Sequence, residues 1–462
     1  MSGTRDRPVH PNVVLAICCT SVLLMSMDLT IVNVALPAIR HDFGSRTSGL
    51  QWIIDAYTLI IASLLMLSGS LADRFGRRRT FQVGLSIFTL GSGLCSIAPN
   101  LHALLAFRAF QAVGASMMNP IAMSIVTNVF VEPVGRARAL GTWGAVAGLS
   151  MGLGPLVGGA LSDSVGWRAI FWINLPIGVL AIALTRRFVP ESKAARPRRV
   201  DPLAQLLVLA MLASITYAVI EGRSRGFRSP PIVGLFVGAG VALLTLVVYE
   251  SRRDEPLIDP RFFRSASFSS ATLIAIASFG SFAGLLFLSA LYLQETRHVT
   301  ALQAGLYTLP LALAMMVTSP ISGRMVGRYG ARPSLVLAGC AIAASGLSLT
   351  SLAADTPTWH VLTSFLVFGV GLGLVNTPIT NAAVSGMPLG QAGVAAAIAS
   401  TSRQTGSALG VATAGALAAA APHSFWWLVV GLGGAIVALG VLSTSAWARR
   451  TARRVAQLLE EP

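Results

Sequence analysis

Four ionisable residues lie inside long apolar stretches of this sequence: Asp28, Asp55, Arg108 and Arg403. A charged side chain in the interior of a bilayer is costly, so such residues usually serve a function or pair with one another. A buried carboxylate could take up and release a proton, and a buried arginine could hold a carboxylate or bind an anionic group. These four residues are therefore the first candidates for a functional site.

Small and polar residues recur at helical spacing around Arg108 and Arg403. The first set is Arg108, Gln111, Ala115 and Asn119, and the second is Ser400, Arg403, Ser407 and Gly410. We expect both stripes to face a cavity, which adds Gln111 and Asn119 to the candidates. Asp28 falls off the polar stripe of its own segment, so periodicity does not aim it at the cavity. The alternative is a structural ion pair of Arg108 with Asp28 or Asp55, which is compatible with a functional role.

The composition indicates what surrounds these residues. Of 462 residues, 54% are hydrophobic and only 11% are charged, whereas a soluble domain carries about 25% charged residues. So few charges cannot cover a water-exposed surface, and we expect lipid around most of the chain. The net charge of +16 would suit nucleic acid, but basic cytoplasmic loops of a membrane protein explain it without that partner.

Fourteen stretches are apolar enough to cross a membrane as helices, which requires about 20 residues each. They cover residues 13–39, 50–71, 80–98, 102–126, 138–161, 167–187, 202–220, 231–249, 268–293, 302–323, 333–352, 358–380, 392–420 and 423–446. With the amino terminus inside, the cytoplasmic loops and tails hold most of the 34 lysines and arginines. Because basic residues accumulate in cytoplasmic loops, we expect a multi-pass protein of the cytoplasmic (inner) membrane with both termini inside.

The loops after the second and the tenth stretch resemble each other. In the first loop the shared residues are Arg74, Phe75, Gly76 and Arg78, and in the second they are Arg328, Tyr329, Gly330 and Arg332. Two similar halves in the same orientation are typical of a parallel-repeat transporter. We therefore expect an all-α fold of two six-helix bundles, at residues 1–187 and 266–462, with two inserted helices in a linker at 188–265.

The fifth stretch is rich in glycine. Gly144, Gly148 and Gly152 lie four residues apart, so they fall near one helical face, and small residues at this spacing let helices approach closely. Pro155 removes a backbone donor and should bend the helix. This face is either an ordinary packing surface or a hinge or seal between the two bundles.

Several of these segments resemble the major facilitator superfamily, and in particular its fourteen-helix drug:proton antiporters. The loop at residues 69–79 resembles the family's signature loop, residues 28–37 its first-helix motif, and residues 104–114 its fourth-helix motif with an embedded arginine. The last match departs at Ala112, where the family usually has glycine. The fifth-helix motif typical of antiporters matches Gly148, Gly152, Gly154, Pro155, Gly158 and Gly159.

This resemblance implies an exporter of drugs or antibiotics that works by alternating access and is driven by the proton gradient, with no cofactor. It implies a monomer, a small lipophilic or cationic substrate, and a proton-coupling cavity that includes the charged residues named above. Asp28 is the first candidate for the proton carrier and Asp55 the second, because water at the outer end of its helix should keep Asp55 ionised. The cytoplasmic gate loop would consist of Gly69, Asp73, Arg74, Gly76, Arg77 and Arg78.

Other functions remain as alternatives. The six histidines are scattered and the four cysteines form no C-x-x-C pair, so neither a metal site nor an enzyme is expected. A proton-coupled uptake symporter could use the same scaffold, although the Gly-Pro pattern of the fifth helix argues against it. A membrane-embedded sensor that moves no substrate would not need the charges inside the spans.

Overall fold

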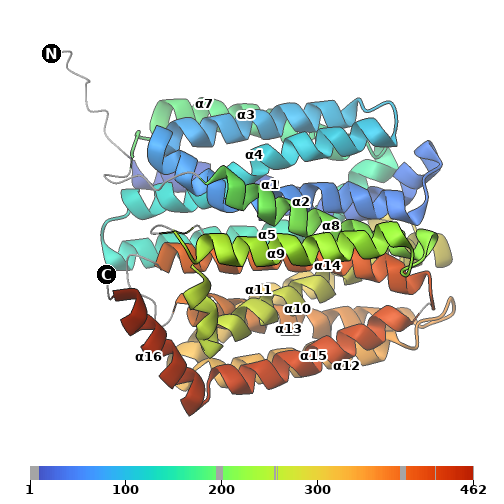
Figure 1. The fold of residues 1–462 in the computed structure, drawn as a ribbon. Helices are drawn as coiled ribbons and strands as arrows, with labels where there is room; N and C mark the ends of the chain where they lie inside the picture. Colours follow the sequence, from blue (N-terminus) through green and yellow to red (C-terminus); the bar gives the residue numbers. More distant parts are fainter. Residues whose placement is uncertain are drawn as a thin grey trace.

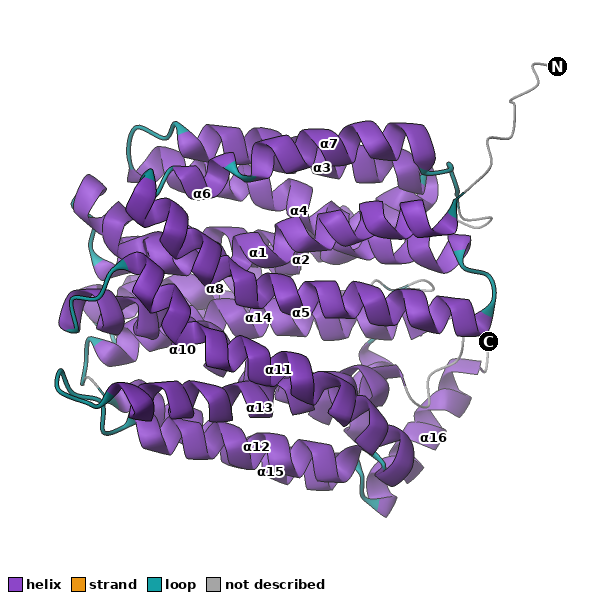
Figure 2. Ribbon diagram, turned by 180° about the vertical axis from the view of Figure 1, so that it is seen from behind, coloured by secondary structure: helices purple, strands orange, loops and turns teal. Residues whose placement is uncertain are grey.

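The computed structural model describes residues 10–193, 201–253, 256, 259–384, 392–421 and 423–460. Every regular element within these ranges is a helix, as Figures 1 and 2 show. The all-α prediction is therefore confirmed for this part of the chain. The predicted linker at residues 188–265 lies partly outside the described residues, since it includes 194–200, 254–255 and 257–258.

The helices follow the order of the predicted stretches. Those of the first half are α1 (Pro11–Phe43), α2 (Thr47–Phe75), α3 (Arg77–Ser96), α4 (Leu101–Val129), α5 (Pro133–Ser164), α6 (Ala169–Trp172) and α7 (Asn174–Phe188). The linker holds α8 (Pro202–Arg225), α9 (Pro230–Glu250) and the short 3₁₀ helix η1 (Pro260–Arg264). The second half holds α10 (Ala266–Leu291), the π-helical turn η2 (Tyr292–Thr296), α11 (Ala301–Tyr329), α12 (Ala331–Leu349), α13 (Thr358–Val384), α14 (Ala392–Ala418), α15 (Ser424–Ser443) and α16 (Ala446–Glu460).

Each of the fourteen predicted stretches falls on a helix, and the sixth falls on α6 and α7 together. Twelve helices in the described part of the chain are long and apolar enough to cross a membrane. The two predicted spans that miss this criterion are α3 and α14, which carry more polar residues. The chain is therefore a multi-pass membrane protein, while the count of fourteen spans stays a prediction.

Local sequence signals set several helix ends. Pro11, Pro202 and Pro230 stand in the first turns of their helices, where the missing N–H costs nothing. The Asn100 side chain accepts a hydrogen bond from Ala103 N at 2.9 Å and caps α4. Such helices satisfy their own backbone groups, which a span in lipid requires.

Helix pairings in the first half are repeated in the second. The contacts of α1 with α5, α3 with α4, α2 with α4 and α3 with α7 recur as α10 with α14, α12 with α13, α11 with α13 and α12 with α15. Ser68 on α2 bonds to Ser116 on α4, and Ser322 on α11 bonds to Leu374 O on α13. In Figure 1 the helices of the first half lie above those of the second.

The repeated loops have similar backbones. Gly76 joins α2 to α3 with φ at 108°, and Gly330 joins α11 to α12 with φ at 80°. Both values lie where a side chain is strained, which explains glycine at both positions. We call the end of the molecule that carries these two loops the basic end, and α16 lies there as well (Figure 1).

The two halves meet along two helix pairs, α2 with α14 and α5 with α11. These pairs are equivalent under the repeat, because each joins the second helix of one half to the fifth helix of the other. The inserted helix α8 packs against both α2 and α14, and α9 packs on α8. In Figure 1 the inserted pair crosses in front of the seam between the halves, and Figure 2 shows α5 and α11 on the opposite side.

Candidate functional site

Asp28 and Arg108 form a buried ion pair inside the first half. Asp28 Oδ2 lies 2.6 Å from Arg108 Nη1, and the two side chains are 0% and 2% exposed. Arg108 also stacks on Tyr57 of α2, with its guanidinium carbon 4.0 Å from the ring centroid, and Nε donates to Ile53 O at 3.5 Å. The alternative of a structural ion pair between Asp28 and Arg108 is thus realised in this conformation.

Amide side chains complete the hydrogen bonding of this pair. Asp28 Oδ1 accepts from Gln111 Nε2 at 3.1 Å and from Asn174 Nδ2 at 3.2 Å. Gln111 Oε1 accepts from Arg108 Nη1 at 2.8 Å. All these residues belong to α1, α2, α4 and α7, so Asp28 faces the interior of the first half, in agreement with its position off the polar stripe. A buried charge pair with this many partners is held in one geometry.

Asp55 occupies a different environment. It is 0% exposed, and neither carboxylate oxygen has a hydrogen-bond partner among the described residues. The expectation that water keeps Asp55 ionised is therefore wrong for this conformation, because neighbouring helices cover the side chain. Gln51, one turn earlier, bonds to Val411 O and Ala412 O of α14 at 3.0 and 2.8 Å.

The position of Asp55 follows from its helical neighbours. Leu59, one turn later, packs in one cluster with Ala408 of α14. Residues four apart share a helical face, so Gln51, Asp55 and Leu59 line the side of α2 that meets α14. Asp55 thus lies at the seam between the halves, whereas Ile53 and Tyr57 face the Arg108 network on the other side of α2.

The remaining cavity candidates do not join this network. Asn119 is half-buried on α4, two turns beyond Gln111, and its Oδ1 has no hydrogen-bond partner among the described residues. Arg403 on α14 donates to Thr380 Oγ1 at 2.7 Å, and its guanidinium carbon lies 5.7 Å from the Phe279 ring centroid. Arg403 therefore belongs to the second half, where it contacts α10 and α13.

The glycine motif of α5 packs against α11 and α1. A methyl group added to Gly152 would overlap the Cβ of Ala312 on α11, and one on Gly159 would overlap Ala301 O. Gly154 and Gly158 approach Thr30 and Ile31 of α1 in the same way. The predicted close approach of Gly144, Gly148 and Gly152 is therefore confirmed at Gly152 and wrong at the other two positions, because a methyl group on Gly148 would meet only Met315 Cε at 3.7 Å and one on Gly144 would meet nothing within 4 Å.

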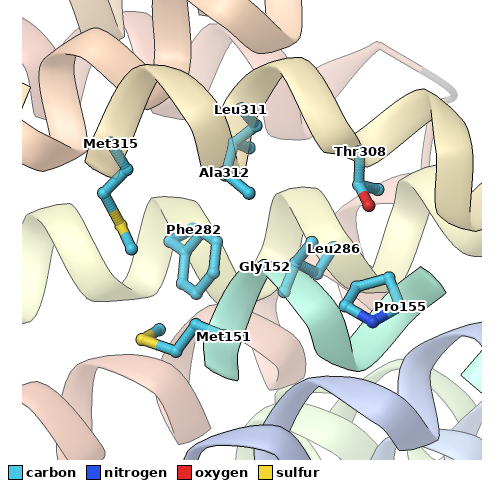
Figure 3. Close-up of a pocket in the computed structure, with 9 residues that line it drawn as sticks. All are labelled: Met151, Gly152, Pro155, Phe282, Leu286, Thr308, Leu311, Ala312 and Met315. Carbon is cyan, nitrogen blue, oxygen red and sulfur yellow. The ribbon is translucent and has the colours of Figure 1, made fainter. Parts of the chain in front are cut away.

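The seam between α5 and α11 leaves little space. Its cavity holds about 10 Å³, which is room for about one water molecule. Figure 3 shows Met151, Gly152 and Pro155 of α5 facing Ala312 and its neighbours on α11. Toward the basic end the packing changes, since a methyl group on Gly144 would meet nothing within 4 Å. Helix α5 continues through Pro155 as one helix.

Polar contacts join the two halves at the end opposite to the basic end. Arg40 at the end of α1 pairs with Glu295 at 2.6 Å. Asp163 at the end of α5 accepts hydrogen bonds from Ala301 N and Leu302 N at 3.1 and 2.8 Å. The carboxylate thereby caps the amino terminus of α11, where an anion is favoured. The structure is therefore closed between the halves at this end.

The predicted gate loop contains an ion pair between two of its own residues. Asp73 Oδ1 lies 3.3 Å from Arg77 Nη2, one turn away. Gly69 and Arg74 stand at the end of α2, where Gly69 is half-buried and Arg74 is exposed. The acidic residue of the loop therefore pairs with an arginine of the same loop.

A linker residue adds a second acid to this loop. Glu191 Oε1 accepts from Arg78 N at 3.1 Å, and Glu191 Oε2 lies 3.8 Å from Arg78 Nε and 3.7 Å from Arg79 Nε. A methyl group on Gly76 would lie 2.6 Å from this carboxylate. Glu191 therefore ties the start of the linker to the amino terminus of α3.

Sequence reasoning missed several residues of these sites. Asn174 is an amide inside an apolar span, which was a readable signal, whereas Tyr57 looked like an ordinary apolar residue. Glu191 and Asp163 stood in loops or at helix ends, where nothing in the local pattern indicated their partners. Among the described residues, no three His, Cys, Asp or Glu side chains gather to hold a metal ion.

A helical membrane protein of two similar halves, with charges buried inside the spans and a tight glycine seam, has the architecture of a transporter. The chain belongs to the Major Facilitator Superfamily, whose family model matches residues 18–411. Members of this family are transporters rather than enzymes, which confirms the prediction of a non-enzymatic function.

Two relatives illustrate the similarity. The multidrug resistance protein Stp of Mycobacterium tuberculosis is 37% identical over 399 residues, which cover 86% of this chain and 74% of Stp. The methylenomycin A resistance protein of Streptomyces coelicolor is 33% identical over 413 residues, 89% of this chain and 86% of that protein. The resemblance to drug-exporting members is thus confirmed at the level of the family.

A solved structure supports the fold. The crystal structure of a POT family transporter in complex with a thioalcohol-conjugated peptide superposes with a TM-score of 0.73. The alignment covers 95% of this chain and 96% of that one, at 14% sequence identity. At this identity the likeness concerns the fold alone.

Proposed function

We propose that this protein is a proton-coupled exporter of small lipophilic molecules that works by alternating access. Its relatives carry the names of multidrug and antibiotic resistance proteins, which favours export over uptake and over a sensor that moves nothing. The fourteen-span topology with both termini in the cytoplasm belongs to this proposal, supported by the basic loops. The basic end then faces the cytoplasm, and the closed end faces outward.

The observation that carries the proposal is the buried Asp55 at the seam between α2 and α14. An ionised carboxylate without partners is costly to bury, and a bound proton removes that cost. When the halves separate at this end, water reaches the carboxylate and the proton can exchange. Proton binding at Asp55 and closure of the outer seam therefore favour each other.

The other residues take supporting roles in this proposal. The network of Asp28, Arg108 and Gln111 keeps α1, α2 and α4 together as one unit. Asp73 and the arginines of its loop form the cytoplasmic gate, and the α5 glycines form the outer seal. Since one chain supplies both halves, a monomer is sufficient, and the energy comes from the proton gradient without a cofactor.

The test is transport of ethidium, a lipophilic cation, in proteoliposomes with an imposed pH gradient. Asp55→Asn should lose pH-driven transport but keep gradient-independent exchange of ethidium, because it imitates the protonated side chain. Asp28→Asn should lower both activities, since it removes the charge that neutralises Arg108. The control is Asp42→Asn, the same change at a carboxylate that is 42% exposed and pairs with Arg168.

The outcomes separate the rival functions. If transport driven by the pH gradient survives in the Asp28→Asn, Asp55→Asn double variant, neither carboxylate is the proton carrier. Uptake driven in the direction of the proton flow, measured in oriented vesicles, would establish a symporter. No flux of ethidium or of a panel of antibiotics through the intact protein would favour a sensor.

A further inference from the structure

The last helix, α16, lies obliquely across the basic end of the molecule rather than along the spans (Figure 1). Only Thr444 and Ser445 separate it from α15, which is one of the helices that can cross a membrane. Ser445 Oγ accepts a hydrogen bond from Ala448 N at 3.1 Å and caps the new helix. Helix α16 therefore begins directly where a span ends, at the surface of the membrane.

One face of α16 packs on the second half of the molecule. Ala448 and Val455 are 0% and 2% exposed. Thr451 lies between them on the same face, and its Oγ1 accepts a hydrogen bond at 3.2 Å from the backbone N–H of the first residue of α10. Further along α16, Leu458 O accepts from Arg261 Nη1 of η1 at 3.1 Å. These contacts fix the rotation of α16 about its own axis.

The opposite face of α16 carries four arginines, and we call it the arginine face. Its members are Arg449, Arg450, Arg453 and Arg454, which are all exposed, and none of them forms an ion pair with another described residue. The sequence from Ala446 to Val455 contains no acidic residue. The arginine face thus presents positive charges that this part of the chain does not neutralise.

Trp447 indicates where the arginine face lies relative to the bilayer. It is 58% exposed, and Arg450 and Arg454 follow it by three and seven residues, so these three side chains form one stripe. Leu442, in the last turn of α15, is 43% exposed, as a side chain that faces lipid would be. Tryptophan is enriched at the level of the lipid headgroups. The stripe therefore begins at the depth where headgroup phosphates lie.

We propose that the arginine face of α16 binds the phosphate groups of anionic lipids at the surface of the bilayer. A guanidinium binds phosphate through its charge and through paired N–H donors. Clusters of basic residues on an amphipathic helix next to a span are attracted to anionic headgroups. An acidic protein would need a face turned to water, whereas the stripe that starts at Trp447 borders the membrane.

This inference goes beyond the proposed export function and takes from it only the topology, in which the basic end faces the cytoplasm. The lipids concerned are then those of the inner leaflet. Because α16 packs on η1 and on α10, a bound lipid holds the linker and the second half at the membrane surface.

The experiment measures which lipid lies next to the arginine face in the full-length protein, in nanodiscs and without any gradient. A bimane fluorophore is attached at Gln457→Cys, an exposed position on this face, after replacement of the four native cysteines. The quenchers are phosphatidylglycerol and phosphatidylcholine, each with the same nitroxide near the headgroup end of one acyl chain. Phosphatidylglycerol should quench more strongly, and raising the salt concentration should reduce the difference.

Two matched pairs of substitutions locate the effect. Arg450→Gln with Arg454→Gln should lower the preference for phosphatidylglycerol by about 10- to 30-fold at low salt, because each basic residue near an anionic surface contributes about fivefold. Lysine at both positions should keep the preference, since the charge remains. The control is Arg186→Gln with Arg187→Gln, which removes two exposed arginines from the end of α7 and should leave the preference unchanged. Thermal unfolding of each variant shows whether it is folded.

Three results would overturn the proposal. Equal quenching by both lipids before any arginine is replaced would show that the face does not select anionic headgroups. An equal loss of preference in the α7 control would assign the effect to the total charge instead of α16. Quenching by neither lipid would show that the face points to water, toward a soluble acidic partner. Because the measurement needs no transport, its failure leaves the export function untouched, and a failure of ethidium transport leaves the lipid site standing.

Discussion

Gly152 offers a direct test of the seam between α5 and α11. In the closed structure an alanine Cβ at this position would overlap the Cβ of Ala312, which stands on a helix and cannot move aside as a flexible side chain can. Sequence reasoning predicts a mild effect for Gly152→Ala and a severe one for Gly152→Leu. The structure revises this expectation, because the first added carbon already collides.

The size of the effect follows from the packing. Overfilling a tight contact costs about 1–3 kcal/mol, and the cost applies only while the two helices touch. Gly152→Ala should therefore shift the equilibrium away from this conformation by about 5- to 150-fold, at about 1.4 kcal/mol per factor of ten. Gly148→Ala is the matched control, because its Cβ would lie 3.7 Å from Met315 Cε, an ordinary contact.

The assay is a distance measurement by electron paramagnetic resonance between spin labels on the two halves. Arg46→Cys and Asp355→Cys place labels at exposed positions at the closed end, after replacement of Cys18, Cys19, Cys95 and Cys340. Gly152→Ala should enrich the longer distance and Gly148→Ala should not. Identical distance distributions for the wild type and a folded Gly152→Ala variant would refute the reasoning about the seam.

Three further predictions concern the rest of the molecule. Arg108→Ala should lower the free energy of unfolding by about 3–5 kcal/mol, because it leaves Asp28 buried without its partner. The measurement is denaturation in detergent, in which the control Arg403→Ala should lose much less. Glu191→Ala should lower the free energy of unfolding by about 0.5–2 kcal/mol, because it removes a hydrogen-bond acceptor at the amino terminus of α3. The control is Glu132→Ala, at an exposed helix start, which should leave the free energy of unfolding nearly unchanged in the same measurement. Reporter fusions should read external at Ser229 and cytoplasmic at the carboxy terminus, and a cytoplasmic signal at Ser229 would remove α8 and α9 from the membrane.

Features set by periodicity and composition could be predicted from the sequence. Apolar runs of about 20 residues must span or be buried, so the positions of the helices followed directly, and so did the close approach at Gly152. The two repeated loops were readable because a glycine with positive φ and its flanking arginines need no distant partner. Hydropathy identifies α3 and α14 less clearly as membrane spans, because the polar residues of these two helices face other helices rather than lipid.

Contacts between distant segments could not be predicted in the same way. Asp28 and Asp55 both lie inside apolar helices, and nothing in either local pattern tells which one meets Arg108. The choice depends on how α1, α2 and α4 rotate about their axes, which the packing of the whole first half determines. Glu191 shows the same limit, since only the folded linker brings it to Arg78.

Because Asp28 and Asp55 have different surroundings, protonation of each carboxylate would affect the rest of the molecule differently. Protonation of Asp28 would leave the guanidinium of Arg108 buried without a countercharge, so that step requires a rearrangement of the whole network. Protonation of Asp55 has no such consequence. Yet both sites share α2, because Ile53 and Tyr57 contact Arg108 from one side of this helix while Asp55 meets α14 from the other. A rotation or shift of α2 that exposes Asp55 must therefore disturb the stacking on Arg108, which would couple the proposed proton site at the seam to the interior of the first half.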